Sequence, residues 1–231
     1  MKIYHYESIP STNAEAKKMI LEGAREGILL AKHQSAGRGR LGRSFFSENG
    51  IFMSMILSPE RFSFDPGFLT SAMAAATCRA ITEQGFSVGI KWVNDIYFEG
   101  KKICGILSEG VSMGEKTLAY VVGIGINVGN TEFPEEIQEI AASLPLDENA
   151  KQTLFLALLN HIERILSENK EDILSYLKEK STVLGKDIRF FGVKNGEGTA
   201  LGLDENGGLI VQTTENEKII LTGGEISVRT Q

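Results

Sequence analysis

Residues 91–107 read KWVNDIYFEGKKICGIL and place charged and amide side chains between apolar runs. The runs 95–98 and 103–108 flank a Glu-Gly-Lys turn, a pattern typical of a β-hairpin. Because neighbouring side chains on a strand point to opposite faces, Lys101 and Lys102 point in opposite directions. The stretch therefore predicts a hairpin, and by itself it favours one with two solvated lysines. A hairpin in which one lysine faces a site and the other faces water is the alternative.

Asn94 and Asp95 stand at the start of this hairpin, between two apolar strands. Buried polar groups need hydrogen-bonding partners, so this pair indicates a site or a local network. A carboxylate in such a place is suited to hold Mg²⁺ beside a nucleotide phosphate. Asp95 is therefore the candidate metal ligand, and an ordinary Asn-Asp strand start is the alternative.

An arginine- and glycine-rich segment, GRGRLGRS, occupies residues 37–44. Glycines let backbone N–H groups approach an anion, and arginine suits bidentate recognition of phosphate or carboxylate. By itself such a segment is more typical of a solvated basic loop or a nucleic-acid patch, and a defined anion site is the alternative that the later motifs bear on. It is not a P-loop, because the lysine is missing and residues 45–49 lead into a strand instead of a helix.

Residues 123–128 read GIGINV, with glycines at alternate positions. A dinucleotide-binding fingerprint would need a third glycine at 128 and a helix opening at 125, but Val128 stands there and no helix pattern follows. The alternation predicts a strand whose glycines admit another backbone or a ligand. Packing in the core is the alternative.

The remaining pattern divides the chain in two. Strands are expected at 3–6, 27–31, 51–57, 88–92 and 118–128, and helices at 66–84, 153–166 and 172–180. A further helix begins at Thr12, which with Glu15 fits a capping box, and ends before Gly23. After residue 184 only short strands remain, at 187–191, 198–204, 209–213 and 218–221, with an Asn206-Gly207 turn. We therefore predict a larger domain over residues 1–184 and a small β-barrel over residues 185–231.

Composition excludes several classes of protein. The net charge of −6 does not favour a globally basic nucleic-acid binder. Two cysteines cannot form a disulfide scaffold or a four-ligand zinc site, and the three histidines show no metal-ligand spacing. The N-terminus has no apolar signal core and no run of 18 apolar residues exists. We expect a cytoplasmic protein with no membrane partner.

Together and in this order, the motifs resemble those of the biotin protein ligases, the enzymes that biotinylate acetyl-CoA carboxylase. The matching pieces are Ser11-Thr12-Asn13, Gln34, and residues 37–43, 91–95, 102–107, 123–128 and 224–229. Val93 stands where the family commonly has proline, and Phe45 where a tryptophan often closes over the ligand. Phe45 still supplies an apolar lid.

The resemblance implies an α+β fold, with a mixed β-sheet flanked by helices followed by a small C-terminal SH3-like β-barrel. Some members carry an N-terminal winged helix that binds DNA. Because Ser11-Thr12-Asn13 begins only ten residues into the chain, we expect the ligase-only type, with no DNA partner. The resemblance also implies a biotin carboxyl carrier protein, of acetyl-CoA carboxylase or a related carboxylase, as partner and allows a homodimer.

The family's reaction joins biotin to ATP as biotinyl-5′-AMP, releasing pyrophosphate, and then passes biotin to a lysine of the carrier, releasing AMP. By resemblance, the catalytic residues are Lys102 and Arg40. The implied biotin-binding residues are Ser11, Thr12, Asn13, Gln34, Arg38, Gly39, Arg40 and Lys102. The implied nucleotide-binding residues are Arg40, Arg43, Asn94, Asp95, Lys102, Asn127 and Arg229. ATP and Mg²⁺ are the expected cofactors, with Asp95 nearest the metal.

Two rival functions share parts of this pattern. A lipoate protein ligase performs the same adenylation on a similar fold, although the Arg-Gly segment and the Lys-Trp-x-Asn-Asp segment argue against it. A biotin-binding sensor without catalytic activity would bind the ligand and release no pyrophosphate.

Overall fold

Seven strands form the larger of two sheets in the computed structural model, which describes residues 1–42, 45, 49–129, 132–192, 195–223 and 227–230. The strands are β1 Ile3–Ile9, β2 Gly27–Gln34, β3 Gly50–Leu57, β4 Val88–Lys91, β5 Asp95–Phe98, β6 Lys101–Met113 and β7 Lys116–Asn127. Their spatial order is β1-β2-β3-β7-β6-β5-β4. β1 runs parallel to β2, and the other neighbours are antiparallel. The predicted mixed sheet is confirmed.

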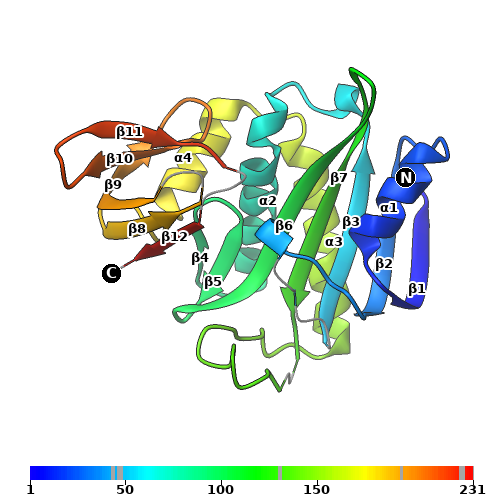
Figure 1. Cartoon of the computed structure of the whole chain (residues 1–231). Helices are drawn as coiled ribbons and strands as arrows, with labels where there is room; N and C mark the ends of the chain where they lie inside the picture. Colours follow the sequence, from blue (N-terminus) through cyan, green and yellow to red (C-terminus); the bar gives the residue numbers. More distant parts are fainter. Residues whose placement is uncertain (43–44, 46–48, 130–131, 193–194, 224–226, 231) are drawn as a thin grey trace.

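The helices cover the two faces of this sheet unequally (Figure 1). They are α1 Thr12–Leu21, α2 Leu69–Glu83, α3 Glu148–Ile165 and α4 Lys170–Glu179, with short 3₁₀ turns at Arg40–Gly42, Pro59–Arg61 and Pro66–Phe68. α2 and α3 pack together behind the sheet, and the alanines at 72–76 of α2 are fully buried there. α1 packs on the opposite face, over β2, β3 and β7. The pocket described below lies on that same face, beside α1.

Five strands form the smaller, antiparallel sheet at the C-terminal end of the chain (Figure 1). They are β8 Asp187–Phe191, β9 Gly196–Leu203, β10 Leu209–Thr213, β11 Lys218–Leu221 and β12 Ser227–Thr230, in the order β11-β10-β9-β8-β12. The Asn206-Gly207 turn is present between β9 and β10, and Gly207 has φ +78°. β12 was not among the predicted strands. The boundary at 184/185 stays a prediction.

Two local predictions were wrong. Ser11, not Thr12, is the N-cap of α1, and its hydroxyl accepts from the backbone N–H of Ala14 at 3.4 Å. Thr12 is already helical, which frees its hydroxyl for contacts outside the helix. The predicted helix 66–84 is divided, because a 3₁₀ turn at Pro66–Phe68 precedes α2. None of the described helices is long and apolar enough to cross a membrane.

Candidate active site

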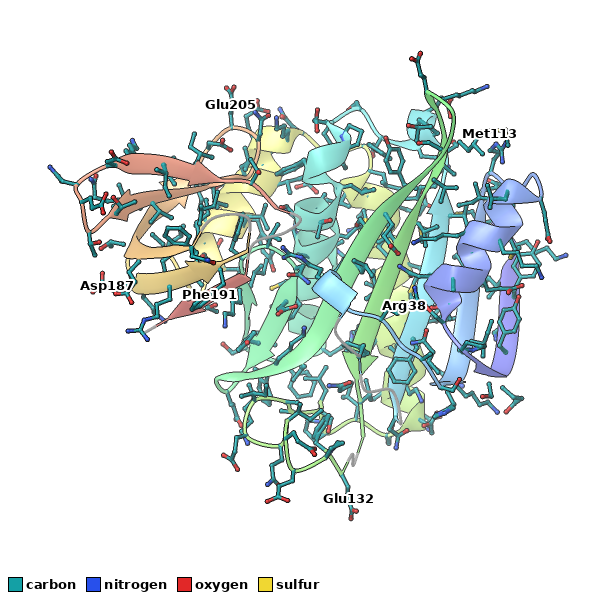
Figure 2. All side chains as sticks on the ribbon, in the orientation of Figure 1. Arg38, Met113, Glu132, Asp187, Phe191 and Glu205 are labelled. Atoms are coloured by element: carbon teal, nitrogen blue, oxygen red, sulfur yellow. The ribbon has the colours of Figure 1, made fainter. Side chains whose placement is uncertain are left out.

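A pocket of about 760 Å³ opens on the sheet face that carries α1. Figure 2 shows Arg38 over this same face. The predicted site residues that line the pocket are Ser11, Thr12, Asn13, Gln34, Arg38, Gly39, Arg40, Asn94, Asp95, Lys102 and Asn127. Arg43 and the side chain of Arg229 lie outside the described residues. The structure thus brings together the described part of the predicted set, although the role of each residue stays a prediction.

The floor of the pocket is made of glycines on two neighbouring strands. Gly105 of β6 pairs with Gly125 of β7. A Cβ at Gly125 would stand 2.6 Å from the Phe45 ring, and one at Gly105 would stand 3.2 Å from it. The ring meets Phe52 edge-on, with 6.3 Å between centroids. The Phe45 ring therefore occupies space that side chains at positions 105 and 125 would fill.

Gly123, two residues earlier on β7, makes room for Asn13 in the same way. A Cβ there would collide with the Asn13 side-chain oxygen. The predicted glycine strand is confirmed. Its glycines admit the side chains of Asn13 on α1 and of Phe45, which follows the Arg- and Gly-rich residues 37–44 (the Arg-Gly loop), instead of another backbone. The high glycine content of GIGINV is therefore a requirement of the pocket.

One polar group of the pocket centres on the start of α1. The backbone N–H of Thr12 donates to Gln34 Oε1 at 2.8 Å, which fixes the orientation of that amide. Ser54 of β3 is fully buried beneath, with its Oγ 2.7 Å from Thr12 Oγ1 and 2.6 Å from Asn13 Oδ1. Hydroxyl and amide groups held in this way are suited to a neutral, polar ring with both donors and acceptors.

A second, charged group lies where β5 and β6 meet the Arg-Gly loop. The Lys102 ammonium lies 2.7 Å from Asp95 Oδ1. Arg40 donates to Asn94 Oδ1 at 2.8 Å, and the Asn94 amide donates to the carbonyl of Ile106 at 3.0 Å. Asn94 thereby ties the arginine loop to the lysine-bearing strand.

The two adjacent lysines of the hairpin do point apart. Lys102 lines the pocket, whereas the Lys101 ammonium donates to the carbonyl of Gln138 at an exposed position, at 2.9 Å. Two solvated lysines, the interpretation that the segment alone favoured, are therefore not found, and the role of Lys102 in a site stays a prediction.

One wall of the pocket, formed by residues 133–141, was not predicted from the sequence. Phe133, Ile137, Ile140 and Ala141 line the pocket. The backbone N–H of Lys102 donates to the carbonyl of Ile140 at 2.8 Å, and the backbone N–H of Ala142 donates to the carbonyl of Lys102 at 2.9 Å. Asn127 is held by the same segment, since its amide donates to Ala142 O at 3.1 Å. Apolar residues at 133, 137, 140 and 141 have helical spacing, a signal that could have found this wall.

The pocket is electropositive although the chain carries a net charge of −6. Among the described lining residues the charged ones are Arg38, Arg40, Lys91, Asp95 and Lys102. Four cations against one carboxylate favour a polyanionic ligand such as a nucleoside triphosphate.

Two weak acids near the site stay protonated at neutral pH. Burial, with a smaller effect from Asp95, raises the pKa of Tyr97 to about 12. Burial also raises the pKa of the fully buried Cys104 thiol. A thiol must ionise to act as a nucleophile, so Cys104 is a structural residue.

Asp95 is the one carboxylate among the described lining residues, and the described residues contain no group of three metal-ligating side chains. Mg²⁺ commonly binds through one or two carboxylates, with water and substrate phosphates completing its shell. The site therefore fits a metal that arrives with a nucleotide and does not fit a metal held by the protein alone.

Comparison with known proteins identifies relatives of the whole chain. Residues 6–127 match the biotin/lipoate A/B protein ligase family, and residues 184–229 match the biotin protein ligase C-terminal domain. The bifunctional ligase/repressor BirA of Bacillus subtilis is 35% identical, over 94% of this chain and 71% of that protein. The biotin–[acetyl-CoA-carboxylase] ligase of Mycobacterium tuberculosis is 29% identical, over 95% and 86%. The biotin protein ligase of Aquifex aeolicus, solved with biotin and ATP, is 28% identical and superposes with a TM-score of 0.85 over 100% and 99% of the two chains.

Proposed function

This chain belongs to the biotin/lipoate A/B protein ligase family, and from that premise we propose that it attaches biotin to a lysine of a biotin carboxyl carrier protein in two ATP-dependent steps. It is an enzyme of the biotin ligase type, like its curated relatives. In the first step a carboxylate oxygen of biotin attacks the α-phosphorus of ATP, and pyrophosphate leaves. In the second the lysine amine attacks the acyl carbon of biotinyl-5′-AMP, loses a proton, and AMP leaves.

The polar group at the start of α1 is the proposed seat of the biotin ring. Ser11, Thr12, Asn13 and Gln34 offer the hydroxyls and amides that a ureido ring requires. Phe45 covers the glycine floor beside them and supplies apolar surface for the rest of the molecule. Arg38 and Gly39 belong to the loop that would close over this end.

The charged group is the proposed seat of the reacting atoms. Lys102 would bridge the biotin carboxylate and the α-phosphate, because both steps develop charge on those oxygens. Arg40 would face the α-phosphate, and Arg43 the departing pyrophosphate. Asn94, Asp95, Asn127 and Arg229 complete the proposed nucleotide site. Mg²⁺, when bound beside Asp95, would offset the charge of the phosphates.

Closure of the Arg-Gly loop would protect the intermediate. An acyl phosphate anhydride hydrolyses in water, and a closed site excludes water. Arg40 would couple closure to the reaction, and its bond to Asn94, whose amide is bonded to β6 at Ile106, supports this role. We also propose 1–184 and 185–231 as the domains, since the family's C-terminal domain matches from residue 184.

The single observation that carries the proposal is that one pocket joins a neutral hydroxyl-amide group to a charged Lys-Arg group. The biotin- and ATP-bound relative from Aquifex aeolicus supports the same pair of ligands.

An avidin blot tests the proposal. The purified chain is mixed with Mg-ATP, biotin and an apo biotin-carrier domain, and a parallel reaction contains lipoate and a lipoyl domain. We expect an ATP-dependent, avidin-reactive carrier band. Modification only in the lipoate reaction would identify the chain as a lipoate ligase. Biotin binding without carrier labelling or pyrophosphate release would identify it as a non-catalytic biotin sensor. Sedimentation with and without biotin and ATP tests separately whether the chain forms the homodimer that the resemblance allows.

A further inference from the structure

One edge of the pocket carries a cation and a phenol that the proposed mechanism does not use. Lys91 of β4 and Tyr97 of β5 both line the pocket. The Lys91 ammonium donates to the Tyr97 hydroxyl oxygen at 3.3 Å and lies 5.1 Å from the centroid of that ring. An ammonium group at the end of a flexible stem is held in place by such a contact. Tyr97 therefore fixes where the Lys91 charge stands.

Lys91 is the last residue of a row that crosses four strands on the pocket face. Gly125 of β7 pairs with Gly105 of β6. Gly105 pairs in turn with Asp95 of β5, and Asp95 pairs with Lys91 of β4. Neighbouring strands lie about 4.8 Å apart, so the row is about 14 Å long. It runs from the glycine floor to β4, which stands at one end of the strand order.

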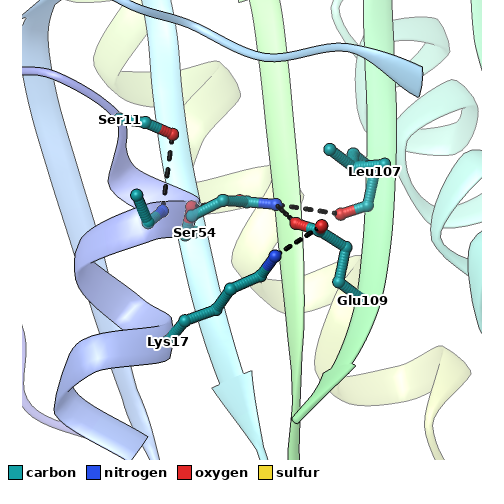
Figure 3. Close-up of polar contacts among 7 residues, drawn as sticks. Ser11, Lys17, Ser54, Leu107 and Glu109 are labelled. Atoms are coloured by element: carbon teal, nitrogen blue, oxygen red, sulfur yellow. Dashed lines mark hydrogen bonds and ion pairs between the residues drawn. The ribbon is translucent and has the colours of Figure 1, made fainter. Parts of the chain in front are cut away.

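The other end of the pocket, beside α1, is closed by polar contacts between α1 and the sheet. Asn13 of α1 donates to Glu109 of β6 at 2.9 Å and accepts from Ser54 of β3 at 2.6 Å. Figure 3 shows Lys17 of α1 and Glu109 pointing toward one another, and they form an ion pair at 2.5 Å. Among the described residues neither Lys17 nor Glu109 lines the pocket. A ring seated at the start of α1 therefore extends along the row, toward β4.

The reacting phosphorus of the proposed function lies partway along this row. A Cβ at Gly105 would stand 3.2 Å from the Lys102 ammonium, so that cation lies over the middle of the row. Lys102 would bridge the biotin carboxylate and the α-phosphate there. In phosphoryl transfer the attacking and leaving oxygens stand roughly in line across the phosphorus. Because the carboxylate arrives from the α1 side, pyrophosphate leaves toward β4.

The apolar wall at 133–141 suits the nucleoside end of ATP better than its phosphates. Phe133, Ile137 and Ile140 bring apolar side chains to the pocket. Their segment pairs with the backbone of Lys102, beside the reacting atoms. Phosphate oxygens are best held by cations and N–H donors, which these side chains do not offer. The β4 end of the row, with the Lys91 ammonium, therefore suits the phosphates.

We propose that Lys91 binds the β- and γ-phosphate oxygens of ATP and holds pyrophosphate as it leaves, and that Tyr97 is a positioning residue for the Lys91 ammonium. This inference rests on the proposed function, which gives the departing pyrophosphate a cation of the Arg-Gly loop and no residue of the sheet. Biotinyl-5′-AMP carries neither a β- nor a γ-phosphate. The pair therefore serves the first step of the reaction and not the second.

Lys91→Met separates the two steps, because it keeps most of the side chain and removes the charge. In biotin-dependent ATP–pyrophosphate exchange we expect KM for ATP and for pyrophosphate to rise at least about tenfold, the effect of one lost charge-assisted hydrogen bond. KM for biotin should stay within about twofold. Supplied with synthetic biotinyl-5′-AMP, the variant should label an apo biotin-carrier domain within about twofold of the wild-type rate. A misfolded variant would lose both steps.

Tyr97→Phe tests the positioning role. We expect KM for pyrophosphate to rise about threefold, the effect of one neutral hydrogen bond, with transfer from biotinyl-5′-AMP unchanged. In the Lys91→Met background the same substitution should add little, because Tyr97 acts through the ammonium that is already lost. Lys91→Arg keeps the charge and should recover most of the loss. Two controls should change neither step: Lys101→Met at the exposed lysine, and Tyr120→Phe on β7, outside the described pocket lining.

The outcomes separate this inference from the proposed function. An unchanged KM for pyrophosphate in Lys91→Met, or an equal loss in exchange and in transfer from biotinyl-5′-AMP, would overturn the pyrophosphate site and leave the ligase intact. An effect of Tyr97→Phe that persists in full without the Lys91 charge would overturn the positioning role. A wild type that performs neither exchange nor transfer would overturn the proposed function itself.

Discussion

The indole N–H of Trp92 donates to the carbonyl oxygen of Gly207 at 2.9 Å, although 115 residues separate the two along the chain. Trp92 lines the pocket directly after β4, and Gly207 lies in the turn between β9 and β10 of the small sheet. The smaller sheet is therefore fastened to a wall of the pocket by one buried hydrogen bond.

Trp92→Phe keeps an aromatic ring, removes the indole N–H together with the five-membered ring that carries it, and leaves Gly207 O without its donor. We expect the free energy of unfolding to fall by about 1–3 kcal/mol, the cost of a buried unsatisfied carbonyl. Urea denaturation measures it. Lys170→Met is the matched control, because the Lys170–Asn206 contact reaches the same turn at an exposed position and should cost about 0.5 kcal/mol or less. Equal losses in both variants would contradict the assignment.

Gly123→Ala places a methyl group where the Asn13 amide oxygen lies. The helix start must shift, so we expect biotin affinity to fall at least about tenfold and stability to fall by about 1–3 kcal/mol, as in overpacked cores. Calorimetric titration and thermal unfolding measure the two. Gly110→Ala on β6 is the control, since its methyl would meet Tyr120 at an ordinary 3.5 Å.

Lys102→Ala removes the cation that lies beside Asp95 in the pocket. Loss of a preorganised charge at developing oxyanions typically costs about 100-fold or more, so ATP–pyrophosphate exchange should fall by that factor. Lys101→Ala changes the neighbouring lysine, which faces away, and should retain exchange within about twofold. Near-normal exchange in Lys102→Ala would remove this residue from the mechanism.

Arg40→Gly deletes the bond from the Arg-Gly loop to Asn94. The loop then loses a charge-assisted hydrogen bond, and we expect release of free biotinyl-5′-AMP to rise at least about tenfold. Chromatography of the released adenylate measures this. A bystander protein in the reaction should become avidin-reactive. If the variant retains its adenylate as firmly as the wild type does, the proposed role of the loop fails.

The alkaline stability of the protein should depend on Tyr97. Its pKa is raised from 10.0 to about 12 in the folded chain. Below pH 10 the phenol is neutral in both states, so the contribution is fully present there. Between pH 10 and 12 the unfolded chain loses this proton first, and stability falls as pH rises. Relative to its own value at pH 8, Tyr97→Phe should lose less stability across that window in urea titrations. Parallel curves for the two proteins would refute this.

Local patterns predicted the parts of this fold that local forces determine. The hairpin of β5 and β6 and the opposite directions of Lys101 and Lys102 follow from the two-residue repeat of a strand. The Asn206-Gly207 turn follows from glycine's tolerance of positive φ. The resemblance then supplied the site residues, and those whose side chains the structure describes line one pocket.

Other features depend on contacts between distant segments and left weaker signals. Ser11 and Thr12 are both good N-cap residues. Ser11 takes the N-cap position because Thr12 forms hydrogen bonds with Gln34 of β2 and Ser54 of β3. Glu109 looks like an ordinary exposed strand residue until Asn13 and Lys17 are placed beside it. The wall at 133–141 is an irregular segment that is paired with the backbone of Lys102.

That pairing gives the protein a built-in reporter. The Lys102 amide proton is held by Ile140 O, and the Lys102 carbonyl by the Ala142 N–H. The wall cannot swing away from the pocket without exposing this one amide to solvent. The hydrogen–deuterium exchange rate of the Lys102 backbone amide therefore measures how often the segment 133–141 moves away from the pocket. Nucleotide occupancy should slow that exchange, so one resonance reads out the state of the pocket.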